Sequence, residues 1–307
     1  MKLIFGLIAF VTLLIFLAVL LQEFRYLRIR RNLAGDRQAL FHSGERFHVV
    51  SALKLTPEQT LLSAVRDFVH GVEKDEGAEV VYAGQTVING RTSSQLPDHD
   101  WEAFVITQYP NRTAWEETSA SPSRRELESH FTQVYSLGMK RSAGLNLAIP
   151  ALLLARRVSQ IVRREPARYP FTPVPGLKVA LAQAPAEDRK RMETFAAALQ
   201  ENLEYGRDGM VIFNFAKNGT SEERKANADY GGEMFALFAE VGAGPMHLGK
   251  SVTLEGEADF DQVIIVHYPG VEFFGEMMTS EFYQGIFPGK QLGDDLSSLT
   301  VPILPYL

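Results

Sequence analysis

Three polar side chains stand on otherwise apolar stretches and are candidates for chemistry. His48 lies in the apolar run 47–53, Asn214 lies in the run 210–215, and His267 ends a run just before a Tyr-Pro dipeptide. Imidazole titrates near neutral pH, so His267 could transfer a proton or bind a ligand. His48 and Asn214 could orient a small molecule in an apolar pocket. The alternative is that all three only satisfy hydrogen bonds of the core or of strand ends.

The residues around the two Tyr-Pro dipeptides form a second set of candidates. Gln108 matches His267 in position, because each stands directly before one of these dipeptides. The tyrosine rings should pack the turn, with their hydroxyl groups reaching partners at the surface. We therefore take Gln108, Tyr109 and Tyr268 as candidate ligand-binding residues, and His267, Asn214 and His48 as catalytic candidates.

Several other chemistries are disfavoured by what the chain lacks. The sequence has no cysteine, which excludes disulfides, thiolate catalysis, Cys-ligated zinc and iron–sulfur clusters. It has no Gly-rich phosphate loop, GxSxG elbow or HExxH helix, and its seven histidines never fall at close metal-ligand spacing. We therefore predict no metal and no cofactor. The formal net charge of −6 argues against nucleic acid as a partner.

The candidate residues belong to a wider internal repeat, which indicates how they are positioned. At an offset of 159 residues (268 − 109), several features of two stretches coincide. The matched pairs are Tyr109-Pro110 with Tyr268-Pro269, Asp100-Trp101 with Asp259-Phe260, and Ser121 with Ser280. Agreement among independent features predicts that one domain is written twice.

Each stretch is predicted to alternate strands and helices. The first has strands at 47–53, 79–83 and 101–107, helices from Thr56 and from Thr113, and a last strand at 144–149. The second has strands at 210–215, 246–254, 262–267 and 299–304, with a helix at 221–241 and a short one near 273–278. Between them lie a Pro-rich linker at 164–176 and a further helix at 186–205. The order is strand, helix, strand, strand, helix, strand.

This order, the strand that ends in Tyr-Pro and the segment Ser280-Glu281-Phe282-Tyr283 resemble the dimeric α+β barrel superfamily of ferredoxin-like domains, and most of all its short members of unknown function. The resemblance implies an α+β fold in which two βαββαβ domains pair their sheets face to face as an intramolecular pseudo-dimer. It also implies a comparison with the small monooxygenases and isomerases of that superfamily. Such a barrel would enclose one or two small apolar pockets.

The first residues predict a membrane anchor. Leu3 to Leu21 carry no charge, and about 20 apolar residues in a helix span the hydrocarbon core of a bilayer. Arginines after this stretch favour a cytoplasmic body. The expected organisation is an anchor at 1–24, a first ferredoxin-like domain at 45–150, connecting segments at 151–207 and a second domain at 208–307.

The sequence leaves the activity open between two classes. One is a membrane-anchored module that binds a small ligand or assists another protein, because no strong catalytic motif is present. The other is a metal-independent enzyme, similar to a monooxygenase or an isomerase, that acts on a small aromatic or apolar substrate. The expected partners are the membrane, through the first helix, and a small apolar ligand. Further oligomerisation stays open.

Overall fold

A computed structural model describes the chain at residues 4–14, 16–17, 20–21, 24, 46–91, 93–96, 100–141, 143–175, 209–254 and 258–307. Its centre is a closed antiparallel barrel with the strand order β1-β3-β2-β8-β5-β7-β6-β4. The strands are β1 Phe47–Leu55, β2 Glu79–Arg91, β3 Ala103–Tyr109, β4 Phe131–Arg141, β5 Met210–Lys217, β6 Gly244–Thr253, β7 Gln262–Tyr268 and β8 Asp294–Pro302. The protein is therefore α+β with an eight-stranded barrel, as the resemblance implied in part.

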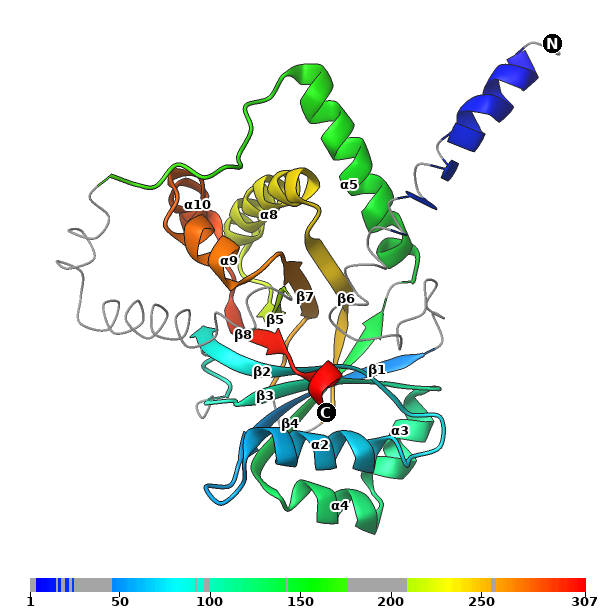
Figure 1. Ribbon diagram of the computed structural model, residues 1–307, viewed down its shortest axis with the longest axis vertical. Coiled ribbons are helices and arrows are strands. Elements are labelled where there is room, and N and C mark those ends of the chain that lie inside the picture. Colours follow the sequence, from blue (N-terminus) through cyan, green and yellow to red (C-terminus); the bar gives the residue numbers. More distant parts are fainter. Residues whose placement is uncertain are drawn as a thin grey trace.

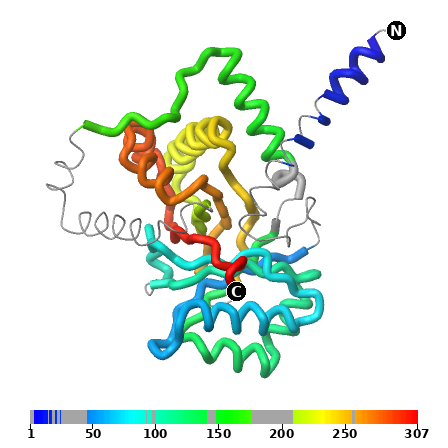
Figure 2. Tube along the Cα trace, viewed as in Figure 1, coloured from blue at the N-terminus to red at the C-terminus, as the bar shows by residue number. Residues whose placement is uncertain are grey.

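The helices cover the barrel in two groups (Figure 1). One group lies against the strands of the first half and comprises α2 Leu61–Val72, α3 Arg112–Ser119 and α4 Pro122–Glu128. The other lies beside the second half and comprises α5 Ala143–Arg163, α8 Ser221–Val241, α9 Val271–Met278 and α10 Glu281–Ile286, with the 3₁₀ turns η3 Phe287–Gly289 and η4 Leu304–Tyr306 near the end of the chain. The C-terminus returns to the first half (Figure 2), where Arg66 Nε donates to the carbonyl of Leu307 at 3.2 Å.

The two halves of the barrel have matching strand orders. The first reads β4-β1-β3-β2 and the second β8-β5-β7-β6, so each places its fourth strand beside its first and its third beside its second. This is the order of a ferredoxin-like βαββαβ unit. That one domain is written twice in this chain stays a prediction.

The expected face-to-face pairing of two sheets is wrong. The sheets instead join at their edges, where β2 pairs with β8 and β4 pairs with β6 through backbone ladders. Closure in this way leaves no unpaired strand edge, and it surrounds one shared interior. The pseudo-dimer of two separate sheets is therefore replaced by one continuous barrel.

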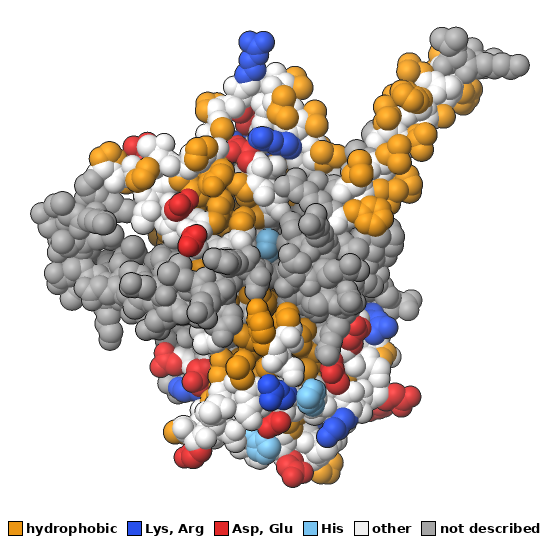
Figure 3. All heavy atoms as spheres, in the orientation of Figure 1, with side chains coloured by type: hydrophobic (Ala, Val, Ile, Leu, Met, Phe, Trp, Pro, Cys, Tyr) orange, Lys and Arg blue, Asp and Glu red, His pale blue; other side chains and the backbone are white. Residues whose placement is uncertain are grey.

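The predicted transmembrane anchor at 1–24, and with it a single-pass membrane localisation with a cytoplasmic body, is contradicted. Across the part of the chain that the structure describes, no helix is both long and apolar enough to span a membrane. Residues 4–14 form a helical run with exposed apolar side chains (Figure 3).

One predicted strand is also wrong. Residues 144–149 belong to the helix α5, whereas the fourth strand of the first half is β4, from Phe131 to Arg141. A short apolar run fits a buried strand or a buried helix equally well. The predicted helix at 186–205 lies outside the described residues.

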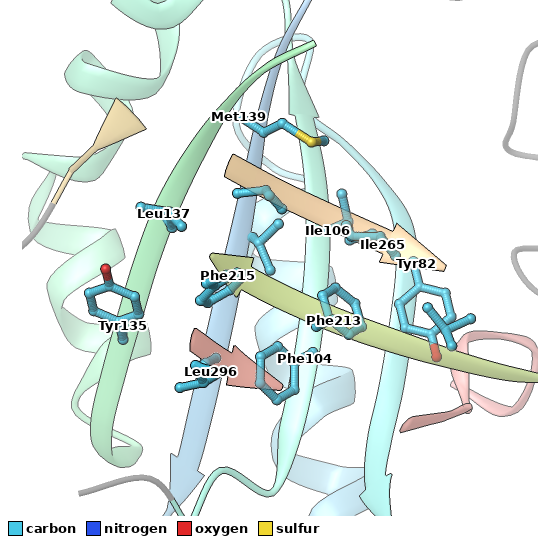
Figure 4. Close-up of a cluster of buried hydrophobic side chains, with 14 of the residues drawn as sticks. Tyr82, Phe104, Ile106, Tyr135, Leu137, Met139, Phe213, Phe215, Ile265 and Leu296 are labelled. Carbon is cyan, nitrogen blue, oxygen red and sulfur yellow. The ribbon is translucent and has the colours of Figure 1, made fainter. Parts of the chain in front are cut away.

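The barrel interior and its outer face have separate hydrophobic cores. The interior core joins both halves, because the rings of Phe104 and Phe213 stack with their centroids 4.7 Å apart. Other residues of this core include Ile106, Tyr135, Leu137, Met139, Phe215, Ile265 and Leu296 (Figure 4). Two further cores lie outside the barrel, one under the helices of each half.

Candidate functional site

Three of the sequence candidates point into the barrel. Side chains of a strand alternate between faces, so residues two apart share a face. His48, Gln108 and His267 each stand two residues from a member of the interior core (Val50, Ile106 and Ile265). All three are buried, with exposed fractions of 0%, 7% and 7%.

These residues lie at one end of the barrel. His48 is the second residue of β1, and its register partner on β3 is Gln108, near the end of that antiparallel strand. His267 lies near the end of β7, opposite Gly244 at the start of β6. We call the set His48, Gln108, His247 and His267 the histidine end.

His247 is a member of this set that sequence reasoning missed. Its ring centroid lies 5.7 Å from that of His48, and its side chain is 1% exposed. It faces Ile265 across the β6–β7 ladder, which makes His267 its diagonal neighbour. A register shift between Pro245 and His247 sets this direction. A bulge of this kind cannot be read from residue alternation alone.

Burial fixes the charge state of His267. Removal from water disfavours the imidazolium form and lowers the pKa of His267 to about 4. The ring is therefore neutral at pH 7, with one nitrogen that accepts and one that donates. Gln108, at the matching position of the first half, donates from Nε2 to Glu79 Oε2 at 2.7 Å.

The strands opposite Gln108 and His267 offer these two residues different partners. Glu79 is the register partner of Gln108, and Gly244 is the register partner of His267. Gly244 has φ 137°, a conformation that favours glycine, and it has no side chain to offer. The position across from His267 therefore supplies no carboxylate to hold the imidazole.

Polar groups connect the histidine end to the aromatic interior. Tyr82 and Thr300 share a hydrogen bond of 2.7 Å between their hydroxyls, and Thr300 Oγ1 donates to the carbonyl of Val211 at 2.9 Å. Val211 is the register partner of His267. The ring of Tyr82 lies 5.6 Å from that of Phe213, so an aromatic wall continues from here into the barrel. Such a wall suits a flat apolar ligand.

The other three sequence candidates lie on the outer face, under the helices. Asn214 Nδ2 donates to the carbonyl of Ile264 at 3.2 Å. Tyr109 belongs to the outer core of the first half and Tyr268 to that of the second, and burial raises the pKa of both phenols. The structure does not bring Asn214, Tyr109 or Tyr268 to the histidine end. Within the described ranges, no group of three or more His, Asp or Glu side chains is arranged to hold a metal ion.

Comparisons with known proteins add no assignment. No family model matches the chain, and a search of curated proteins found no match. Among solved structures, an anthrone oxidase-like protein aligns at 8% identity over 84% of this chain and 91% of its own, with a TM-score of 0.46. A candidate monooxygenase from Lactobacillus acidophilus NCFM aligns at 8% identity over 84% and 94%, with a TM-score of 0.37. A mutant chlorite dismutase from Candidatus Nitrospira defluvii aligns at 10% identity over 89% and 96%, with a TM-score of 0.40. At these scores the likeness carries no argument about the activity of this chain.

Proposed function

We propose that this protein is a metal-independent enzyme, of the isomerase or monooxygenase type, whose histidine end takes a proton from a small aromatic or apolar substrate. The observation that supports this most is His267, a buried neutral imidazole that faces the barrel interior and has glycine opposite it. A neutral imidazole can accept a proton at pH 7, and the aromatic wall beside it can hold an apolar ring.

The pKa of His267 limits the class of substrate. A base whose conjugate acid has a pKa of about 4 is weak, so the proton must come from an acidified position. A carbon between an aryl ring and a carbonyl group meets this need, because the resulting enolate is delocalised. We assign the binding of the carbonyl oxygen to His48 and His247, whose ring centroids lie 5.7 Å apart.

The two reaction types share this first proton transfer and differ in the next step. In an isomerase, the proton held by His267 returns to another carbon of the same substrate, so nothing else is consumed. In a monooxygenase, dioxygen oxidises the enolate: one oxygen atom becomes a carbonyl oxygen on the deprotonated carbon, and the other leaves as water with the two hydrogens that this carbon loses. The proton transfer can therefore be tested without choosing between them.

The test is hydrogen exchange at an activated carbon. We would incubate the protein with 2-indanone in D₂O and follow loss of the signal of the protons beside the carbonyl by NMR, while an oxygen electrode follows uptake of dioxygen. A general base is worth about 10²–10⁴ in rate, so His267→Gln should slow catalysed exchange at least 100-fold. His70→Gln, on the exposed face of α2, is the matched control. Equal exchange by His267→Gln and the unchanged protein would refute the proposal.

A second function, binding without turnover, is favoured by the apolar and aromatic lining of the barrel interior. Among the described residues, this lining includes the rings of Phe104, Phe213 and Phe215, which could contact an apolar ligand. A ligand carrier would bind 2-indanone, seen as saturable shifts in the protein spectrum, yet leave its exchange at the rate of the buffer. The same NMR experiment therefore separates the enzyme from the carrier.

A further inference from the structure

A buried hydrogen-bond donor without a partner among the described residues lies just before β3, at the end of this strand opposite Gln108. Trp101 precedes this strand, is 1% exposed and belongs to the interior core. Its indole Nε1–H has no hydrogen-bond partner in the described parts of the chain. Indole nitrogen only donates, so a buried N–H of this kind calls for an acceptor.

The main chain around Trp101 is held by several hydrogen bonds, in contrast to its indole N–H. The carbonyl of Trp101 accepts from Asn89 Nδ2 at 3.2 Å, and Asn89 Oδ1 accepts from Ser298 Oγ at 2.8 Å. The neighbouring Glu102 fixes both adjacent strands, because its carboxylate accepts from the backbone N–H of Leu55 at 2.7 Å and its carbonyl accepts from Thr86 N at 2.8 Å. The backbone carbonyls of Trp101 and Glu102 therefore have hydrogen-bond partners, whereas the indole N–H has none among the described residues.

A second buried polar atom near Trp101 also has no hydrogen-bond partner among the described residues. Thr86 Oγ1 is buried and finds no hydrogen-bond partner among the residues that the structure describes. Thr86 is the register partner of Thr300, whose hydroxyl bonds Tyr82 inside the barrel, so Thr86 shares the interior face. Buried polar groups of native proteins are nearly always satisfied, and the exceptions mark sites where a water, an ion or a ligand belongs.

The surroundings of Trp101 select a flat and neutral ligand. Its ring lies 6.3 Å from that of Tyr135, which lies 6.4 Å from Phe215, and Phe215 lies 5.8 Å from Phe260. Tyr135 and Phe215 stand close together in the interior view (Figure 4). The rings that follow one another from the indole are all uncharged. A charged ligand would lose its hydration without compensation, whereas a neutral ring that carries one acceptor oxygen would not.

We infer that Trp101 anchors the oxygen of a neutral aromatic ketone or quinone, in a second binding site at the start of β3. Gln108 of the histidine end lies seven residues further along, which is about 23 Å at the rise of an extended strand. The site therefore goes beyond the proposed function, and it neither needs nor implies proton transfer by His267.

The chain offers a direct probe, because it has only two tryptophans. Trp115 lies in α3 in a tilted contact with Phe47, and Trp115→Phe keeps a ring there. In this variant, labelled with ¹⁵N, the only indole N–H signal belongs to Trp101. We would titrate it with 1-indanone and, separately, with indane, which has the same bicyclic frame without the carbonyl oxygen.

The expected result is a saturable downfield shift of the Trp101 N–H with 1-indanone and none with indane. A net hydrogen bond corresponds to about a threefold to tenfold change in affinity, so Trp101→Phe should weaken binding of 1-indanone by that factor and leave that of indane unchanged. Thr86→Val should have a smaller effect in the same direction.

Three outcomes would overturn the inference. Equal affinities for both compounds with a static N–H signal would mean that the barrel binds aromatic rings without this anchor. If neither compound bound, the site would not take neutral aromatic ketones. An N–H that exchanges magnetisation with water and ignores both compounds would show that a buried water satisfies it. The titration uses an intact Trp101, so it remains decisive if Trp101→Phe fails to fold.

Discussion

The two halves of the barrel place different residues at the same position of the fold. In the first half, the residue before the Tyr-Pro dipeptide is Gln108, and its amide is bound to Glu79 on the next strand. In the second half the residue is His267, and the next strand offers Gly244. One position is thus closed by a satisfied polar pair, and the other presents a neutral base. Two halves with the same strand order therefore need not share a role: Gln108 is held in a structural pair, whereas we propose that His267 is reactive.

The tyrosines of the two dipeptides differ in the same manner. The charges that act on Tyr109 are the guanidinium of Arg124, which lowers its pKa against the larger effect of burial, and the carboxylates of Asp75 and Glu128. Tyr268 packs edge to face against Phe238 and Phe274. Charged side chains therefore act on Tyr109, whereas Tyr268 contacts two aromatic rings.

The interior, in contrast, does not divide into halves, and Phe213→Ala tests this most severely. Phe213 is fully buried and stacks on Phe104 from the other half. Truncation of a buried Phe to Ala costs about 3–5 kcal/mol. We expect the free energy of unfolding in urea to fall by this amount in a single transition. Phe287→Ala, a half-exposed ring stacked on Tyr283, is the control and should cost much less. Two separate unfolding transitions in urea would show that the halves do not share one core.

The next largest effect concerns pH and the difference between His267 and Gln108. The pKa of His267 in the folded protein, about 4, lies below its ordinary value of 6.5, so the unfolded chain binds this proton more readily. The stability that the neutral ring contributes is fully present above about pH 6.5 and is lost as the pH falls toward 4. Across this window the loss amounts to about 3 kcal/mol.

His267→Gln makes the second half resemble the first and should remove this loss. We would measure urea unfolding of both proteins at several values between pH 7 and pH 4, and compare the change in each. Titrating carboxylates contribute equally to both, so they cancel in the difference. Parallel curves for the two proteins would mean that His267 is not buried in its neutral form.

Much of the barrel could be predicted from the sequence, because strand alternation is a local signal and the repeat at 159 residues is found by comparing the chain with itself. Strands were expected at 47–53, 101–107, 210–215 and 262–267, and β1, β3, β5 and β7 are found there. The apolar run 144–149 was misassigned, since length and composition do not separate a buried strand from the start of α5. The pairing of the two sheets depends on edges that are far apart in sequence.

The candidate site was predicted less well, and the reason is geometric. Alternation shows that Asn214 shares a face with Ile212, but it does not show which face of β5 is inside. The structure places both toward the helices, while His48 and His267 face the interior. His247 owes its direction to a bulge next to Pro245, and the orphaned indole of Trp101 appears only when its neighbours are known.

The smallest effect compares the serines that match at the repeat offset, Ser121 and Ser280. Each caps a short helix by accepting from a backbone N–H three residues later, at 3.1 Å in both halves. Ser280 is fully buried and also donates to the carbonyl of Met277, whereas Ser121 is partly exposed. Loss of an N-cap costs about 0.5–2 kcal/mol, and an unsatisfied buried group adds to it. Ser280→Ala should therefore cost about 2 kcal/mol in urea unfolding and Ser121→Ala about 0.5–1 kcal/mol. Equal costs would mean that the burial of the second cap adds nothing, and that the two halves differ at the barrel end but not under their helices.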